Sequence, residues 1–82
     1  MEELLNLVVR NKQGVLFSAK VKAVTSFNER GEFDVLPEHE NFISIIKNKI
    51  IIYKTPKEIQ EIDVENGVLK VYENNVNIYI GL

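Results

Sequence analysis

Residues 15–27 alternate apolar and polar side chains with a period of two. The odd positions are apolar or small apart from Thr25, and the even positions include Ser18, Lys20 and Lys22. Because successive side chains of a strand point to opposite sides, this alternation predicts one strand, or two strands around a bend, with one buried face. A pattern of this kind favours a sheet protein over a helical one.

The same signal recurs along the rest of the chain in short segments rich in β-branched and aromatic residues. These further candidate strands are residues 5–9, 33–36, 42–46, 49–54, 59–64, 68–73 and 76–80. Short strands at this spacing are typical of an all-β sandwich or barrel. We therefore expect one domain, residues 1–82: a small two-sheet antiparallel β-sandwich of about eight to ten short strands, with no C-terminal helical hairpin.

Three polar segments are expected to separate the strands. Asn28-Glu29-Arg30-Gly31 and Glu73-Asn74-Asn75 are polar breaks between apolar runs. Asn66-Gly67 predicts a two-residue hairpin, because a type I′ turn needs two positive φ angles and Asn and Gly accept them most readily.

Composition excludes several classes of function. The net charge is -2, so the basic surplus of a general nucleic-acid binder is missing. There is no cysteine, which excludes disulfides, thiolate zinc sites and cysteine nucleophiles. No apolar run reaches the roughly 18 residues of a membrane span, and the N-terminus is acidic. We expect a cytoplasmic protein that reaches a membrane only through a partner.

One stretch is more apolar than a sandwich strand requires. Ile50-Ile51-Ile52-Tyr53 is apolar on both faces, and Phe42-Ile43 and Ile45-Ile46 extend this character. A sandwich strand buries one face and exposes the other, so the second face needs a cover. That cover is either a loop of this chain or another protein.

Candidate catalytic groups are scarce. The one histidine, His39, lies between Glu38 and Glu40, which could suggest a base or a metal ligand. One histidine with scattered carboxylates is a poor metal-ligand set, and a local hydrogen bond in a polar loop is the simpler interpretation. The chain has no nucleophile-elbow pattern, no GxxxxGK[ST] and no GxGxxG. We therefore expect no catalytic residue, no metal and no cofactor.

The stretch Gly31-Glu32-Phe33-Asp34-Val35-Leu36-Pro37-Glu38-His39 resembles the signature of the ε subunit of F-type ATP synthases, called δ in mitochondria. Four other segments agree in order and spacing with that family: residues 5–9, 15–21, 66–71 and 75–78. The resemblance covers essentially the whole chain. Asp34 and Glu38 depart from it, since the family usually has Gly at the first position and Gly or Asn at the second.

The resemblance implies a non-catalytic rotor subunit of the central stalk. Such a subunit binds the γ subunit and the c-ring, and helps to couple proton translocation to ATP synthesis at the cytoplasmic face of the cell membrane. Glu32 matches the acidic position that faces the c-ring. His39 matches the family histidine near γ, and Phe42 and Ile43 could supply apolar area on that side.

Two other interpretations remain open at this stage. One is a free-standing β-sandwich module that binds other proteins and shares only the fold of the family. The other is a small hydrolase, which would need a serine beside His39. For Glu32 the simpler alternative is a turn carboxylate.

Overall fold

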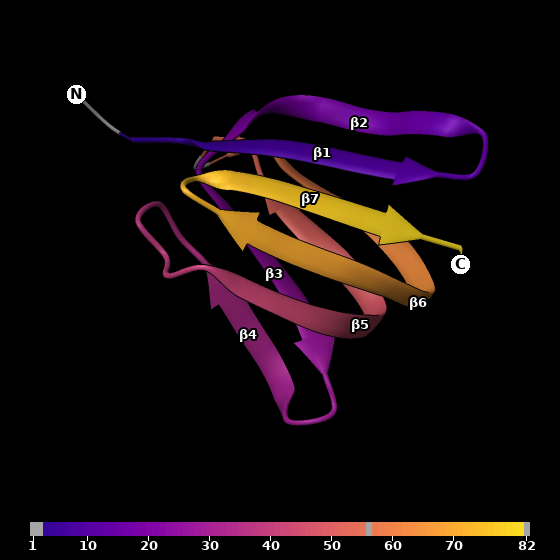
Figure 1. The fold of residues 1–82 in the computed structure, drawn as a ribbon. Helices are drawn as coiled ribbons and strands as arrows, with labels where there is room; N and C mark the ends of the chain where they lie inside the picture. The colour runs from indigo at the N-terminus through magenta and orange to yellow at the C-terminus, as the bar shows by residue number, and fades with distance from the viewer. Residues whose placement is uncertain (1–2, 56, 82) are drawn as a thin grey trace.

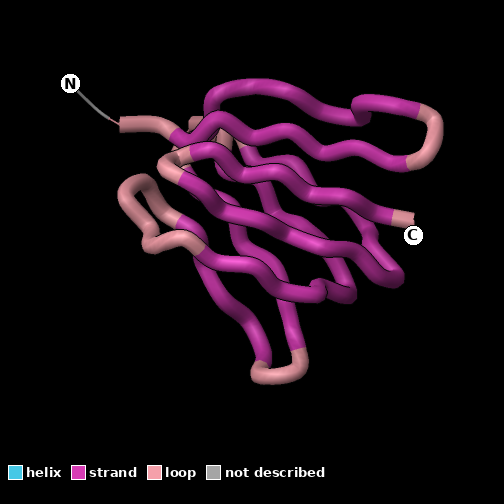
Figure 2. Tube along the Cα trace, in the orientation of Figure 1, coloured by secondary structure: helices cyan, strands magenta, loops and turns pink. Residues whose placement is uncertain are grey.

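The computed structural model describes residues 3–55 and 57–81, and these form seven β-strands and no helix (Figures 1 and 2). The strands are β1 Leu5–Asn11, β2 Gly14–Val21, β3 Ala23–Asn28, β4 Gly31–Val35, β5 Phe42–Tyr53, β6 Ile59–Tyr72 and β7 Asn75–Ile80. The all-β class is confirmed, and the segments expected from the alternation lie mainly within these strands. Since the described part contains no helix, it contains none that is long and apolar enough to cross a membrane.

The strands form one hydrogen-bonded sheet in the order β2-β1-β7-β6-β5-β3-β4. All neighbours are antiparallel except β1 and β7, which are parallel. Within β6, only residues 67–72 pair with β7, and within β5, residues 47–53 pair with β3. The two halves of these long strands therefore belong to different parts of the sheet.

The sheet folds over at the middle of β5 and β6, so that its two halves enclose one core. In Figure 1, β3 and the far halves of β5 and β6 pass behind the layer formed by β1, β7 and the near half of β6. The buried apolar residues form a single cluster to which all seven strands contribute. These residues are Leu5, Leu7, Val9, Val21, Val24, Val35, Ile46, Ile50, Ile52, Val64, Leu69, Val71, Val76 and Ile78.

The prediction of two separate sheets with eight to ten strands was wrong for the described residues. Segments 42–46 and 49–54 belong to one strand, β5, and segments 59–64 and 68–73 fall mainly in one strand, β6. A bulge between Ile46 and Asn48 bends β5 without ending it, and Asn48 has a φ of 75°. Bulges increase bending and twist while the ladder continues on either side, so each pair of predicted strands is joined.

The hairpin predicted at Asn66-Gly67 was wrong for a related reason. Gly67 lies inside β6, opposite Ile46 on one side and Ile80 on the other. A Cβ atom at Gly67 would lie 2.7 Å from the backbone oxygen of Tyr79, so only glycine fits this close approach. The tight type I′-like turn is instead Glu73-Asn74, between β6 and β7, where φ is 45° and 63°.

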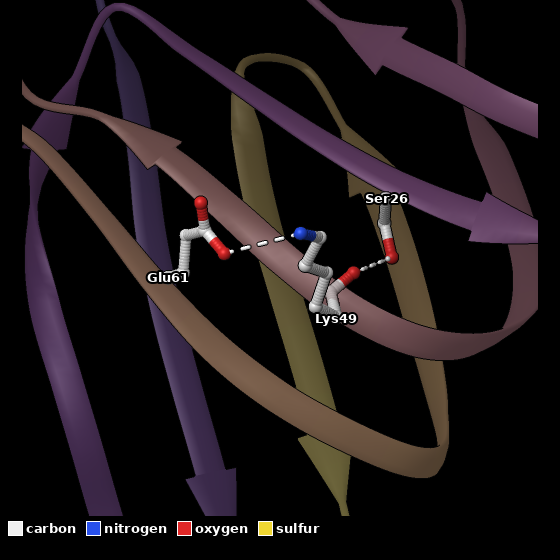
Figure 3. A network of polar contacts seen from close by, with 3 residues as sticks. All are labelled: Ser26, Lys49 and Glu61. Atoms are coloured by element: carbon white, nitrogen blue, oxygen red, sulfur yellow. Dashed lines mark hydrogen bonds and ion pairs between the residues drawn. The ribbon is translucent and has the colours of Figure 1, made fainter.

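The chain bends between β2 and β3, and the buried face changes phase there. In β3 the even positions Val24 and Ser26 have no exposed surface and Thr25 is also buried, although the alternation predicted that only the odd positions face inward. The buried Ser26 hydroxyl donates a hydrogen bond of 2.9 Å to the carbonyl oxygen of Lys49, beside the bulge (Figure 3). This bond satisfies a polar group that would be costly to bury alone. On the outside of β5, Lys49 Nζ forms a 3.2 Å ion pair with Glu61.

Candidate functional site

His39 lies in the loop between β4 and β5, where two local hydrogen bonds hold it. Its Nδ1 lies 2.6 Å from the carbonyl oxygen of Glu40, so Nδ1 carries the hydrogen, and its backbone N–H donates to Leu36 O at 3.1 Å. The half-buried ring packs edge-on against Phe42, with ring centroids 5.6 Å apart. Within residues 3–55 and 57–81, no three His, Cys, Asp or Glu side chains gather as metal ligands would.

Phe42 and Ile43 begin β5 and point to opposite sides of the sheet. Phe42 packs inward, half-buried, with its ring centroid 5.5 Å from that of Phe33. Ile43 points outward and is 67% exposed. The structure therefore joins His39 to Phe42 but separates both from the exposed surface that carries Ile43.

Glu32 lies near the start of β4, beside the turn that joins β3 to β4, whereas the loop with His39 follows the end of β4. It pairs in register with Phe27 and is exposed. The turn is held by Asn28 Oδ1, which accepts a 2.8 Å hydrogen bond from the N–H of Arg30, and Gly31 has a φ of 115°. The predicted polar break is confirmed, and it places Glu32 at the hairpin tip at the bottom of Figure 1.

Asn74, in the β6–β7 turn, forms hydrogen bonds with the β4–β5 loop, with β1 and with the residues before β1. Its Oδ1 accepts a 2.6 Å hydrogen bond from the N–H of Glu38, and its backbone oxygen accepts one of 2.8 Å from Asn6. Its side-chain amide lies 3.4 Å from a carboxylate oxygen of Glu3. The β6–β7 turn thereby holds the loop that carries His39 in place, despite the positive φ of 68° at Glu38.

The sheet half made of β2, β1, β7, the second half of β6 and the first half of β5 has one side on the core and one side exposed. Cross-strand register places Ile45, Val68, Tyr79 and Arg10 in one row of the exposed side. We call this side the outer face. It consists of Asn6, Val8, Arg10, Val15, Ser18, Lys20, Ile43, Ile45, Val68, Lys70, Tyr72, Asn75, Asn77 and Tyr79.

Apolar residues gather at the β5 side of the outer face, although Val15, opposite Arg10 at the β2 side, is also 58% exposed. Ile43 and Ile45 are 67% and 76% exposed, and Val68, directly opposite Ile45, is half-buried. By contrast, Ile50 and Ile52 are fully buried, and Ile51 and Tyr53 are half-buried. The excess apolar character predicted for β5 is therefore partly core, and its exposed part lies at Ile43 and Ile45.

The outer face contains cations but no carboxylate, although the chain has 12 acidic residues. Its cations are Arg10, Lys20 and Lys70. None of the three has an ion-pair partner in the described part of the chain. Arg10 lies over the ring of Tyr79, with 5.5 Å from its guanidinium carbon to the ring centroid. The Arg10 Nε is buried and has no hydrogen-bond acceptor among those residues.

A shallow hollow of about 470 Å³ borders the apolar side of the outer face. It lies between the β3–β4 turn and β5, and it is lined by Asn28, Glu29, Arg30, Ile43, Ser44, Ile45, Ile46 and Lys47. Asn28 Nδ2 donates a 3.2 Å hydrogen bond to Ser44 Oγ across it. The hairpin tip and the exposed isoleucines are therefore neighbours.

Sequence reasoning singled out Ile43 and Ile45 but missed the rest of the outer face. The available signal was the alternation in residues 68–72 and 75–79. Their outward positions, Val68, Lys70, Tyr72, Asn75, Asn77 and Tyr79, include no carboxylate. Only the strand order shows that these segments lie side by side with β5 and β1.

Residues 4–80 match the family described as ATP synthase, Delta/Epsilon chain, beta-sandwich domain. The chain is 34% identical over 79 residues to the ATP synthase epsilon chain of a Nitratiruptor species, covering 95% of this chain and 61% of that relative. It is 31% identical over 77 residues to that of Sulfurimonas denitrificans, covering 93% and 59%. The chain therefore spans about three-fifths of the length of these curated relatives.

Two solved structures share the fold. One is a chain of the Euglena gracilis mitochondrial ATP synthase (OSCP/F1/c-ring), with a TM-score of 0.87 and 18% identity over 94% of this chain and 50% of that one. The other belongs to the central stalk and c-ring of the Tetrahymena thermophila mitochondrial ATP synthase. Its TM-score is 0.79 and its identity 9%, over 96% of this chain and 64% of that one. At such low identities the similarity establishes the arrangement of strands.

Proposed function

The chain belongs to the delta/epsilon family of ATP synthase chains, whose β-sandwich domain it matches, and from this premise we propose that it is a non-catalytic rotor subunit of the ε type. In this role residues 1–82 form the sandwich domain of the central stalk, bind the γ subunit and the c-ring, and help to couple proton translocation to ATP synthesis. The subunit lies at the cytoplasmic face of the cell membrane and is held there by the complex.

The exposed isoleucines of β5 carry this proposal. Ile43 and Ile45 are 67% and 76% exposed on a face that no described residue of this chain covers. Large apolar side chains grouped on a surface are typical of a protein interface, and aliphatic residues at an interface centre are protected there from water. The named relatives are bacterial epsilon chains, so the ε role is proposed rather than the mitochondrial δ role.

The other candidate residues receive separate roles in this proposal. Ile43 contacts γ directly. His39 and Phe42 do not contact γ but position Ile43, because their rings pack together and shape the loop that precedes β5. Glu32, exposed at the hairpin tip, faces the c-ring and pairs with a basic loop residue there. An exposed pair adds little affinity, so Glu32 adjusts the fit of the contact.

Direct binding to the γ subunit of the same organism tests the proposal. We expect Ile43→Asp and Ile45→Asp each to weaken binding by about 2 kcal/mol, because each places a charge at a desolvated apolar contact. The control is Ile59→Asp, since Ile59 is 57% exposed but begins β6, outside the outer face. Isothermal titration calorimetry gives the affinities. Absence of γ binding by the folded wild-type chain would contradict the proposal and favour a free-standing binding module.

A further inference from the structure

The charge on the outer face points to the chemistry of the surface that covers it. Resting on the γ-binding role proposed above, we propose that the partner presents carboxylates to Arg10 and Lys70 beside an apolar patch that covers Ile43 and Ile45. The interface is therefore electrostatically polarised, with an acidic surface on the partner and a carboxylate-free surface on this chain.

The first argument is the separation of charge. The chain carries 12 acidic and 10 basic side chains, yet the outer face has cations and no acid. Like-signed groups on one face raise the local potential and attract a surface of opposite sign. A neutral or basic partner would bury Lys70 or Arg10 without a counter-charge, which is costly.

The second argument is that these cations lack partners. Lys49 outside the outer face has Glu61 as an ion-pair partner, but Arg10 and Lys70 have none in residues 3–55 and 57–81. The Arg10 guanidinium lies over the Tyr79 ring with its Nε buried, so the terminal amino groups are the donors left for a partner. A guanidinium held in this way is suited to bind a partner carboxylate, because its fork of donors matches the two carboxylate oxygens.

The third argument distinguishes a protein from other anionic partners. A nucleic acid or an anionic membrane needs several clustered cations, since each phosphate contact contributes separately. The outer face has three cations, spread from β2 to β6, which is too few for such a cluster. Exposed Ile43 and Ile45 occupy its β5 side. A folded protein surface with an apolar centre and carboxylates beside it fits both halves of the outer face.

Salt and charge reversal test the inference in one experiment. Affinity for the purified γ subunit is measured from about 50 mM to about 300 mM salt, a range over which screening increases strongly. We expect wild-type affinity to fall about tenfold, mainly through the association rate. We expect Lys70→Glu to weaken binding at low salt by about tenfold or more and to reduce the salt dependence. Lys70→Gln should show a smaller loss.

The matched control is Lys57→Glu, which makes the same charge change at an exposed lysine between β5 and β6. Salt-insensitive wild-type binding, or equal effects of Lys70→Glu and Lys57→Glu, overturns this inference and leaves the rotor role intact. Absence of γ binding at every salt concentration overturns both. Competition with γ by a single-stranded oligonucleotide or anionic vesicles overturns the inference in favour of that ligand. Thermal unfolding checks that each variant is folded. If Lys70→Glu does not fold, the affinity of Lys70→Gln for γ tests the inference instead.

Discussion

Glu38 combines an unfavourable backbone conformation with a favourable hydrogen bond. Its φ of 68° lies in the left-handed region, which costs a residue with a Cβ atom about 1 kcal/mol. Its N–H donates to Asn74 Oδ1 at 2.6 Å, so the loop before β5 keeps this geometry. The resemblance that marked a Gly or Asn at this position therefore has a physical basis, whereas Asp34, the other departure, lies within β4 without a positive φ.

We predict that Glu38→Gly stabilises the fold. Glycine relieves the strain at this φ and retains the N–H, but it gains entropy in the unfolded chain, so the net increase in the free energy of unfolding is about 0.5 kcal/mol. Urea denaturation measures it. Glu40→Gly is the control, because Glu40 lies in the same loop without a positive φ, and it should give no gain. Equal effects of the two substitutions would show that the strain is absent.

At the scale of elements, the alternation located the strand segments but did not show which segments are continuous as one strand. The bend between β2 and β3 and the turns that precede β4 and β7 were predictable, because local residue types decide them. The continuity of β5 and β6 was not, because an Asn-Gly pair suits a hairpin as well as a strand position with a close neighbour. Here Gly67 occupies a strand position because the backbone of Tyr79, on β7, lies too close for any side chain.

The candidate site was predictable to a similar degree. Consecutive apolar residues at the start of β5 indicated two apolar faces, and Ile43 does lie on an exposed one. Arg10, Lys70 and Tyr79 could not be found, since they come from three strands whose adjacency depends on the parallel pairing of β1 with β7. Such a pairing joins the two ends of the chain and leaves no local signal in either segment.

We predict that the two faces of β5 respond differently to truncation. Phe42→Ala should lower the free energy of unfolding by about 2 kcal/mol, less than for a fully buried ring, because Phe42 is half-buried against Phe33 and His39. Ile43→Ala should change it by less than about 0.5 kcal/mol, because Ile43 is exposed. Urea denaturation of both variants checks this difference. A large loss for Ile43→Ala would mean that its side chain contributes to the fold.

At the scale of the whole molecule, the sheet presents two surfaces with different chemistry. The outer face is apolar and cationic, whereas the β3–β4 hairpin tip carries the acids Glu29 and Glu32. The shallow hollow lined by Ile43, Ile45 and Arg30 lies where these surfaces meet. The proposed rotor role requires two partners at once, and adjacent surfaces of different character would allow each partner to be recognised separately.

The separation of these surfaces leads to a prediction about the assembled enzyme. Glu32→Lys should leave γ binding and the ATPase activity of soluble F1 unchanged, because Glu32 is on the hairpin tip and outside the outer face. Proton pumping per ATP hydrolysed by the membrane-bound enzyme should fall, because the new lysine would repel the basic c-ring residue with which Glu32 is proposed to pair. Ile45→Asp should instead lower γ affinity and the amount of subunit retained on F1. Calorimetry with γ, ATPase assays and fluorescence quenching of a pH-sensitive dye in membrane vesicles measure the three quantities. If Glu32→Lys pumps as wild type does, Glu32 is a turn carboxylate. If it weakens γ binding as strongly as Ile45→Asp, the tip and the outer face contact the same partner, and the two-surface arrangement is wrong.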